Sequence, residues 1–296
     1  MDENEWLARR FEDHRPHLRA VAYRMLGSLA EAEDAVQESW LRLSRAGTDD
    51  VRNLGGFLTT IVARVCLNML RSRSSRREEP LDVHVPDPVV SGAAGMDPEQ
   101  QVLLADSVGL ALLVVLQTLA PAERLAFVLH DMFGMPFDEI APIVDRSPTA
   151  ARQLASRARR RVQGAAPEPE ADPVRQRQVV DAFLAAARGG DFEGLVAVLA
   201  PDVVLRADSG ASAAGVGAST VIHGAEQVAT QALSFSRFAR FARHALVNGD
   251  AGLVNIVEGR PRAVMGLTVR DGRIVEINIL ADPERLNRID LTVLDS

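Results

Sequence analysis

Two proline-rich breaks are the feature that most constrains how this chain of 296 residues folds. The stretch 78–100 carries four prolines and six acidic residues without a sustained hydrophobic period, and 164–173 carries three prolines in ten residues. Segments of this composition bury too little apolar surface to fold alone, so we expect an acidic linker and a second, shorter linker. The chain is therefore predicted to form three domains, over 1–77, 101–163 and 174–296.

The composition narrows the chemistry that the chain can perform. All 33 basic residues are arginine, which excludes a P-loop lysine and lysine-based covalent catalysis. The single Cys66 excludes an internal disulfide and a multi-cysteine zinc site. The acidic start and the short longest apolar run, Leu110–Leu116, lead us to expect a cytoplasmic protein without a membrane span.

The net charge of −7 conceals two strongly basic stretches. Arg71–Arg77 contains four arginines, and Arg146–Arg161 contains six; neither contains an acidic residue. Basic stretches on either side of an acidic linker favour nucleic acid as a partner more than the mean charge suggests.

The first segment is predicted to be helical. Apolar residues recur at helical spacing towards a plausible C-cap at Gly27, then over Ala30–Leu43, and again over Phe57–Arg73. Two polar stripes stand out on these helices. One contains Asp34, Gln37 and Glu38, and the other contains Arg64, Asn68 and Arg71 and leads to Arg73. From the residues alone, each stripe is more typical of a solvent-facing helix side than of a binding surface.

The middle segment contains the most specific pattern of the sequence. A short helix over Phe137–Val144 is followed by a tight turn, a capping Ser147 and Pro148 at the start of a second, basic helix, which indicates a helix-turn-helix. Arginine pairs with guanine and glutamine with adenine, so the polar face of the second helix suits base reading. That face contains Thr149, Arg152, Gln153, Ser156 and Arg160, while Arg157, Arg159 and Arg161 are expected at its flanks, against phosphates.

The last segment is predicted to be α+β. Helical stretches over 174–188 and 192–199 precede alternating β-rich runs, and Asp271-Gly272 between the last two runs indicates a tight hairpin. The alternation of phenylalanine and arginine over 235–243 favours an amphipathic helix, with a domain or DNA contact as the alternative.

The first 163 residues resemble the bacterial RNA polymerase sigma factors of the extracytoplasmic-function class. The resemblance rests on AEDAVQESWLRL (Ala32–Leu43), GGFLTTIVARVCLNMLRSR and the later helix-turn-helix. It implies that Asp34, Gln37 and Glu38 dock on the β′ clamp helices of core RNA polymerase, with a further contact to the β flap. It also implies that 49–73 melts and reads the minus-ten element and that 148–161 reads the minus-thirty-five element.

The last segment resembles the SnoaL-like (NTF2-like) domain that follows the sigma domains in group 41 of this class, the SigJ type. The resemblance rests on DFEGLVAVLAPDVVLRAD, VNG and DGRIVEINILADPERL. It implies regulation in cis, and it places a cis-acting motif at Asp282, Pro283 and Leu286. Asp208–Ala211 stands at the position of a second motif of the family. The acidic linker could occupy a basic channel of the polymerase.

Two readings from other classes remain open at this stage. One is a one-component regulator that binds DNA alone and senses a ligand through its last domain. The other is an enzyme joined to a DNA-binding module, which requires an acid or histidine inside the cone of that domain. The available groups are Asp181, Asp202, Asp208, His223 and Glu226. They form no recognisable pair, and His14 with His17 falls short of a metal site, so we expect no catalytic, cofactor or metal residues.

Overall fold

The computed structural model describes residues 3–46, 53–76, 83–92, 109–165, 167, 170–210, 219–289 and 291. The chain divides into two compact units. Unit 1 contains Met1–Pro80, Pro98–Asp106 and Val115–Ala165, and unit 2 contains Leu81–Asp97, Ser107–Val114 and Ala166–Ser296. Unit 2 therefore takes in parts of the chain that lie well before the predicted third domain at 174–296.

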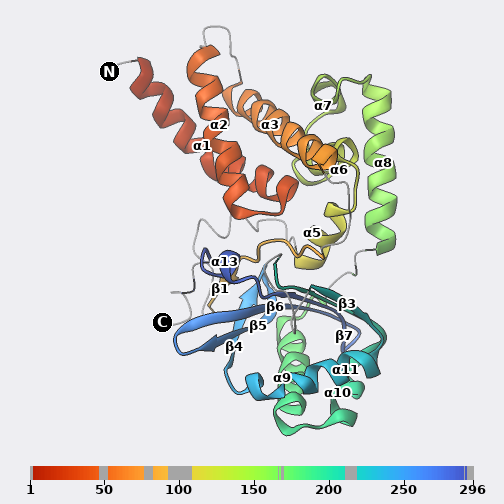
Figure 1. Cartoon of the computed structure of the whole chain (residues 1–296). Helices are drawn as coiled ribbons and strands as arrows, with labels where there is room; N and C mark the ends of the chain where they lie inside the picture. Colours follow the sequence, from red (N-terminus) through yellow and green to blue (C-terminus); the bar gives the residue numbers. More distant parts are fainter. Residues whose placement is uncertain are drawn as a thin grey trace. The chain divides into compact units, whose positions relative to one another are not determined.

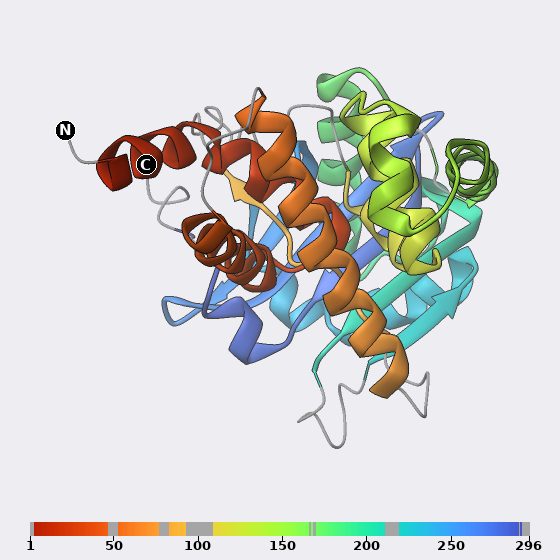
Figure 2. The same cartoon turned by 90° about the horizontal axis from the view of Figure 1, so that it is seen from above.

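Unit 1 begins with three helices that pack side by side (Figures 1 and 2). They are α1 (Glu3–Leu26), α2 (Leu29–Ala46) and α3 (Leu54–Arg76). Gly27 ends α1 with φ 71°, and its N–H donates to Tyr23 O at 2.8 Å, which is a conformation that glycine adopts without a Cβ penalty. Leucine, valine and alanine from all three helices form a buried core around Leu18, Val36 and Val62.

One helix of unit 1 is long and apolar enough to cross a membrane by length and composition alone, over Leu54–Arg73 of α3. Its apolar side packs on α1 and α2, which is the pattern of a core helix. Cys66 lies in this core, and burial raises the pKa of its thiol to about 12. The thiol therefore stays protonated and unreactive near neutral pH.

Five further elements follow along the chain, and Leu110–Val114 at their start belongs to unit 2. They are α5 (Leu110–Gln117), α6 (Pro121–Phe127), the π-helical turn η1 (Val128–Met132), α7 (Phe137–Val144) and α8 (Pro148–Ala165). The buried Arg124 of α6 donates to Met25 O at 2.8 Å and to Gln117 O at 2.7 Å, so it joins this group to the end of α1. Asp97 and Pro98, a capping residue and a first-turn residue that suit the start of a helix, lie outside the described residues.

Unit 2 is an α+β domain with a seven-stranded sheet, and the helices between Pro173 and Ser234 cover one face of that sheet (Figure 1). The helices are α9 (Pro173–Gly189), α10 (Phe192–Val198), α11 (Ala225–Ser234), α12 (Ser236–Ala239) and α13 (Pro283–Leu286). The strands are β1 (Val90–Ser91), β2 (Leu199–Asp208), β3 (Thr220–His223), β4 (Ala242–Val247), β5 (Asp250–Val257), β6 (Arg260–Arg270) and β7 (Arg273–Leu280), in the order β1-β4-β5-β6-β7-β2-β3.

The sheet confirms the predicted hairpin at Asp271-Gly272. Arg270 pairs with Arg273 across a two-residue turn in which both central residues have positive φ. The expected helix over 235–243 is wrong in most of its length. Only the four residues of α12 are helical there, and Arg243 already belongs to β4. The pairing of β4 with β5 overrode the local helical pattern.

The acidic linker also departs from the predicted tether. Residues 83–92, which we call the strap, pack within unit 2, and β1 extends the sheet by pairing with β4. Val85, Val89 and Val90 are buried. The two X-Pro steps before Val89 preset an extended backbone, so the strap loses little chain entropy when it docks on a sheet edge. Its composition alone does not reveal the partner that orders it.

Candidate nucleic-acid interface and strap site

The turn between α7 and α8 has the geometry of a helix-turn-helix. Asp145 ends α7 in the left-handed conformation, with φ 55°. The Ser147 hydroxyl accepts from Ala150 N–H at 3.2 Å, and Pro148 occupies the first position of α8, where a missing N–H is harmless. Pro142 lies within α7 and removes one backbone donor, yet the helix keeps the predicted bounds Phe137–Val144.

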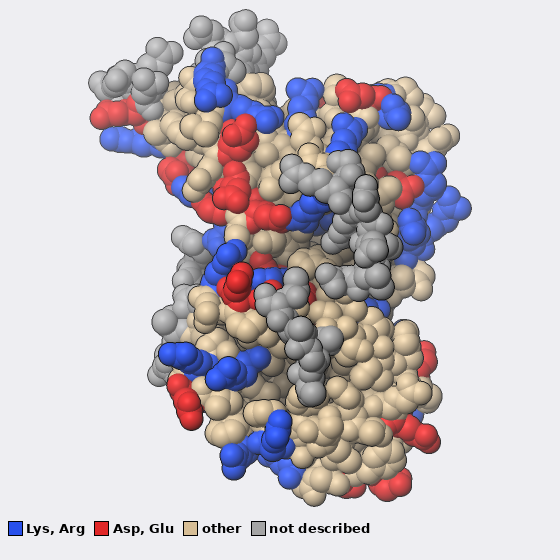
Figure 3. All heavy atoms as spheres, in the orientation of Figure 1, with Lys and Arg blue, Asp and Glu red and all other residues tan. Residues whose placement is uncertain are grey.

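The two faces of α8 separate as predicted from the sequence. Ala151, Ala155 and Ala158 are buried against the rest of unit 1. The opposite face is exposed, and Figure 3 shows basic side chains gathered along the outer side of α8. Arg152 also lies over the Phe137 ring at 5.3 Å, which steadies its guanidinium. The exposed face contains all five predicted base-reading residues: Thr149, Arg152, Gln153, Ser156 and Arg160.

The flanking arginines of α8 have protein partners instead. Arg157 donates to Glu123 at 2.8 Å, and Arg159 is bonded to Asp131. Arg161 lies 3.7 Å from Glu123. The described structure therefore uses these three arginines to attach α8 to α6 and η1, a role that the sequence analysis did not anticipate.

The polar stripe of α3 forms one exposed helix side. Arg64, Asn68 and Arg71 are all exposed at spacings of four and three residues. Arg64 donates to Pro142 O at 3.4 Å. Arg73 pairs with Glu31 of α2, which occupies part of its donor set. Residues 49–52 of the expected minus-ten loop lie outside the described residues.

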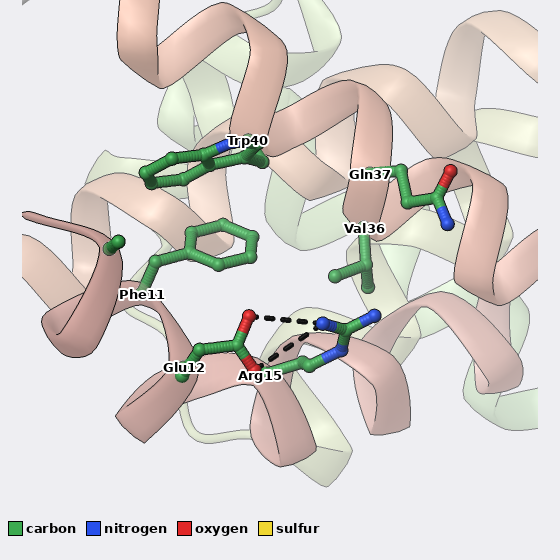
Figure 4. A pocket seen from close by; sticks show the side chains of 7 residues that line it. Phe11, Glu12, Arg15, Val36, Gln37 and Trp40 are labelled. Carbon is green, nitrogen blue, oxygen red and sulfur yellow. Dashed lines mark hydrogen bonds and ion pairs between the residues drawn. The ribbon is translucent and has the colours of Figure 1, made fainter. Parts of the chain in front are cut away.

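The stripe of α2 borders a small pocket between α1 and α2. Asp34 and Gln37 are exposed, and Glu38 is held by Arg42 at 2.8 Å. The pocket has a volume of about 270 Å³, with Gln37 at its edge. Figure 4 shows the Phe11 and Trp40 rings, which contact each other at a tilt of 57°, on one side and the Arg15–Glu12 pair on the other. The side of α2 that carries the predicted polymerase-binding residues is thus accessible and partly apolar, and Leu41 beside it is 46% exposed.

A buried arginine at the end of unit 2 holds the strap. Arg285 donates to Asp87 at 2.7 Å and to the backbone O of Val85. The same guanidinium donates to Asp208 at 2.7 Å, and Asp208 accepts from Val85 N–H at 2.9 Å. Arg285 is therefore shared by two carboxylates from distant parts of the chain, with side-chain exposures of only 12% for Asp87 and 5% for Asp208.

Asp208 is ionised at this site despite its burial. Burial alone would raise its pKa. Hydrogen bonds from His84 and from the N–H groups of Val85 and Gly210, together with the charge of Arg285, lower the pKa of Asp208 to about 2. The carboxylate therefore stays charged across the physiological pH range, and its bond to the strap is kept over the same range.

A second anchor fixes the other end of the strap. Val89 N–H donates to the side chain of Asn248 at 3.0 Å, and Asn248 N–H donates to Val89 O at 2.8 Å. Asn248 is buried and has a positive φ of 52° in the turn between β4 and β5. The turn was noted in the sequence only as part of a resemblance, and no pattern there reveals its reciprocal bonds to the strap.

The predicted cis-acting residues support this site without touching the strap in the described contacts. Asp282 caps α13, where its side chain accepts from the N–H groups of Glu284 and Arg285. Leu286 is buried, and Pro283 is exposed at the first helical position. A Cβ on Gly210 would lie 2.5 Å from Asp282, so the two motif loops approach closely. The contact with the strap is made by Arg285, the neighbour of these residues in the chain, which no sequence pattern singled out.

The side of the sheet that faces the helices is apolar. Leu205, Leu253 and Ile277 belong to one buried cluster there. Of the five acids and histidines that the enzyme reading required, four are exposed: Asp181, Asp202, His223 and Glu226. The fifth, Asp208, is bonded to the strap. The described residues hold no group of three metal-ligating side chains.

Comparison with known proteins identifies the family to which the chain belongs. The model of sigma-70 region 2 matches residues 10–76, and that of sigma-70 region 4 matches residues 109–162. The chain is 39% identical over 289 residues to the ECF RNA polymerase sigma factor SigJ of Mycobacterium tuberculosis (strain ATCC 25618 / H37Rv), which covers 93% of this chain and 91% of SigJ. The chain is an extracytoplasmic-function (ECF) RNA polymerase sigma factor.

A second relative and a solved structure agree with this assignment. The probable ECF sigma factor SigI of M. tuberculosis (strain CDC 1551 / Oshkosh) is 34% identical over 288 residues, with 97% of both chains covered. The crystal structure of M. tuberculosis SigJ matches with a TM-score of 0.77 at 34% identity, covering 96% of this chain and 100% of that chain. The expected fold, two all-α sigma domains followed by an α+β domain, is confirmed.

Family membership also decides between the three functional classes that the sequence left open, namely a sigma factor, a one-component regulator and an enzyme joined to a DNA-binding module. ECF sigma factors are transcription initiation factors and not enzymes, and they act with core RNA polymerase and promoter DNA. The readings as a one-component regulator and as a tethered enzyme are therefore set aside. The family does not state which residues of this sigma factor make each contact.

Proposed function

We propose that unit 2 restrains the sigma factor in cis by holding the strap. The observation that carries the proposal is the buried guanidinium of Arg285, which bonds to Asp87 and Val85 of the strap and to Asp208 of its own domain. A buried ion pair of this kind costs several kcal/mol when one partner is removed. The attachment is therefore strong enough to bias the conformation of the segment that connects the two sigma domains.

The reach of that segment explains why holding it matters. Roughly 33 residues connect the end of α3 to the start of α5, and a free chain of this length spans at most about 110 Å. Promoter elements 25 base pairs apart are separated by about 85 Å at 3.4 Å per base pair. The strap and Leu110–Val114 both belong to unit 2. While unit 2 holds the strap and Leu110–Val114, the linker cannot extend fully. The largest distance between the two sigma domains is then set by unit 2 and not by the length of the free chain.

Release of the strap then accompanies engagement of polymerase and promoter. Core polymerase and DNA favour the extended arrangement of the sigma domains, and unit 2 favours the held one, so the two compete through one linker. A coupling of 1–3 kcal/mol, which is ordinary for such competition, corresponds to an effect of about 5- to 150-fold.

Transcription with reconstituted core polymerase tests the restraint. Arg285→Ala should raise promoter-dependent transcription at limiting sigma factor by at least about fivefold. Arg288→Ala is the matched control, because Arg288 is an exposed arginine just beyond the same helix. Equal transcription by wild type, Arg285→Ala and Arg288→Ala would contradict the restraint, and so would a decrease specific to Arg285→Ala.

The stripe Asp34, Gln37 and Glu38 is proposed to dock on the β′ clamp helices, and the helix-turn-helix domain is proposed to contact the β flap. The exposure of the stripe on α2 supports the first contact. Glu38→Arg would place like charge against a basic docking site, which can cost several kcal/mol. Core affinity should fall about 100-fold in a pull-down titration, with unchanged helical content. Full retention of core affinity by this variant would exclude Glu38 from the interface.

Promoter reading is proposed to use two surfaces of unit 1 in the cytoplasm, where polymerase acts. The exposed face of α8, with Thr149, Arg152, Gln153, Ser156 and Arg160, is assigned to the minus-thirty-five element. The stripe of α3, with Arg64, Asn68, Arg71 and Arg73, is assigned to the minus-ten element. What supports both assignments is the combination of arginine and amide side chains on accessible helix sides.

A further inference from the structure

Unit 2 carries a concentration of arginine that neither the strap nor the core accounts for. Residues 233–262 contain five arginines and only two acids, although the whole chain has a net charge of −7. One of the acids, Asp250, is bonded to Gln176 and so is already engaged within the unit. The five arginines are exposed and are together called the basic face: Arg237, Arg240, Arg243, Arg260 and Arg262.

The sheet brings the two ends of this stretch together. Ile256 N–H donates to Phe241 O at 3.2 Å, and Ile256 is also the partner of Pro261. Phe241, Ile256 and Pro261 therefore form one row across three strands. Neighbouring strands lie about 4.8 Å apart, so the backbone beside Phe241 and the backbone beside Pro261 are separated by about 10 Å. Figure 3 shows basic side chains gathered over this end of the sheet, with little acid among them.

The turn that carries Arg237 and Arg240 is fixed by hydrogen bonds from α9. Arg188 of α9 donates to Ala239 O and to Ala242 O, both at 3.1 Å, and so fixes the backbone on either side of Arg240. Arg237 lies over the Phe238 ring at 4.7 Å, and Arg240 lies over the Phe241 ring at 4.6 Å. These contacts restrict the guanidinium groups before any ligand arrives, which reduces the entropy lost on binding.

We propose that the basic face binds the phosphate backbone of duplex DNA. Arginine is suited to phosphate because its planar donors match phosphate oxygens and its charge displaces condensed counterions. The two groups of arginines start from backbones about 10 Å apart, and the major groove of B-DNA is about 12 Å wide, so their side chains can reach phosphates on both of its walls. Contacts to phosphate carry no sequence information, so the basic face binds without regard to sequence.

This site is separate from the promoter-reading surfaces of unit 1. It adds a nonspecific, salt-dependent contact to a chain whose family already works on promoter DNA. Because the contact lies in unit 2, it continues to operate whether or not the strap is held. Its effect is on affinity for DNA of any sequence and on the salt dependence of that affinity.

The test is a salt titration of the full chain with a fluorescent 40-base-pair duplex that contains no promoter element. The variant is Arg240→Ala/Arg260→Ala/Arg262→Ala. The control is Arg270→Ala/Arg273→Ala/Arg288→Ala, which removes the same charge at exposed positions outside the basic face. Each lost phosphate contact lowers the slope of log K against log salt by about 0.9, so the variant should lose about 2.7 and the control close to none.

Equal slopes for the variant and the control would overturn the proposal. It would also be overturned if the variant bound DNA as wild type does but lost affinity for core polymerase, because the face would then be a protein-binding surface. The recognition helix is intact in both proteins. The ratio of promoter affinity to nonspecific affinity depends on base contacts made by α8. We therefore expect this ratio to be the same in the variant, the control and wild type.

Discussion

The arginines of α8 and the single Arg285 of α13 show how burial decides what one residue type does. Arg152 and Arg160 are exposed side chains of α8. Arg285 has a side-chain exposure of 16% and is bonded to two carboxylates and a backbone carbonyl. An exposed guanidinium keeps its donors for an external partner. A buried guanidinium must direct its donors to acceptors within the protein, because an unpaired buried charge is strongly destabilising.

Arg157, Arg159 and Arg161 lie between these extremes. They are on the same helix as Arg152, but each of them pairs with Glu123 or Asp131. Charge along a helix therefore does not identify a DNA-binding face by itself. The partners on the neighbouring helices decide which arginines remain available.

The largest effect is expected at the strap anchor. Asp208→Asn removes the charge that Arg285 and Val85 N–H share, and it should destabilise unit 2 by about 3 kcal/mol. Thermal unfolding would measure the loss, and Asp202→Asn, an exposed acid on the same strand, is the control. A loss no greater than that of the control would show that the buried pair contributes little.

The pH dependence of the same anchor sharpens the comparison. The pKa of Asp208 is about 2 in the fold and 3.8 without it. A lowered carboxyl pKa contributes stability that is complete above 3.8 and is lost as pH falls through about 2. The stability difference between wild type and Asp208→Asn should be constant from pH 5 to 8 and disappear near pH 2. A difference that changes between pH 6 and 8 would point to another titrating group.

The exposed arginine should act on binding and leave stability unchanged. Arg152→Ala should cost about 1–3 kcal/mol in promoter affinity and relax the preference at one base pair, because a bidentate contact to a base is lost. Binding to a set of promoters with single base changes would show this pattern. A uniform loss over the whole set would indicate that Arg152 contacts phosphate.

The cap of the recognition helix should have a smaller effect. Ser147→Ala removes the acceptor for Ala150 N–H and should lower stability by about 1 kcal/mol. Denaturant unfolding measures this change, and Ser156→Ala, an exposed serine within α8, is a suitable control. Identical unfolding midpoints for the two variants would mean that the cap is not formed in solution.

The smallest effect is expected for a flanking arginine. Arg159→Ala breaks a pair whose arginine side chain is 42% exposed, so we expect a loss of at most about 0.5 kcal/mol in stability. The salt dependence of DNA binding should stay as it is in wild type. A slope that falls by about 0.9 would restore the original prediction that Arg159 meets a phosphate.

The sequence predicted what local pattern controls. The periodicity of α8, its Ser147-Pro148 start and its buried alanines follow from spacing within a few residues, and so does the Asp271-Gly272 hairpin. The strap was not predicted, because its order depends on Arg285 and Asn248, which lie about 200 and 160 residues further along the chain. The helix expected over 235–243 was wrong for the same reason, because β4 forms only where β5 is available to pair.

The central claim is that unit 2 holds the strap and that active transcription requires its release. Amide hydrogen exchange at Val85 and Val89 tests this most directly, because their N–H groups bond to Asp208 and Asn248. We predict strong protection of both amides in the free sigma factor and loss of that protection in the open complex with core polymerase and promoter. Equal protection of both amides in the free chain and in a transcribing complex would contradict the account.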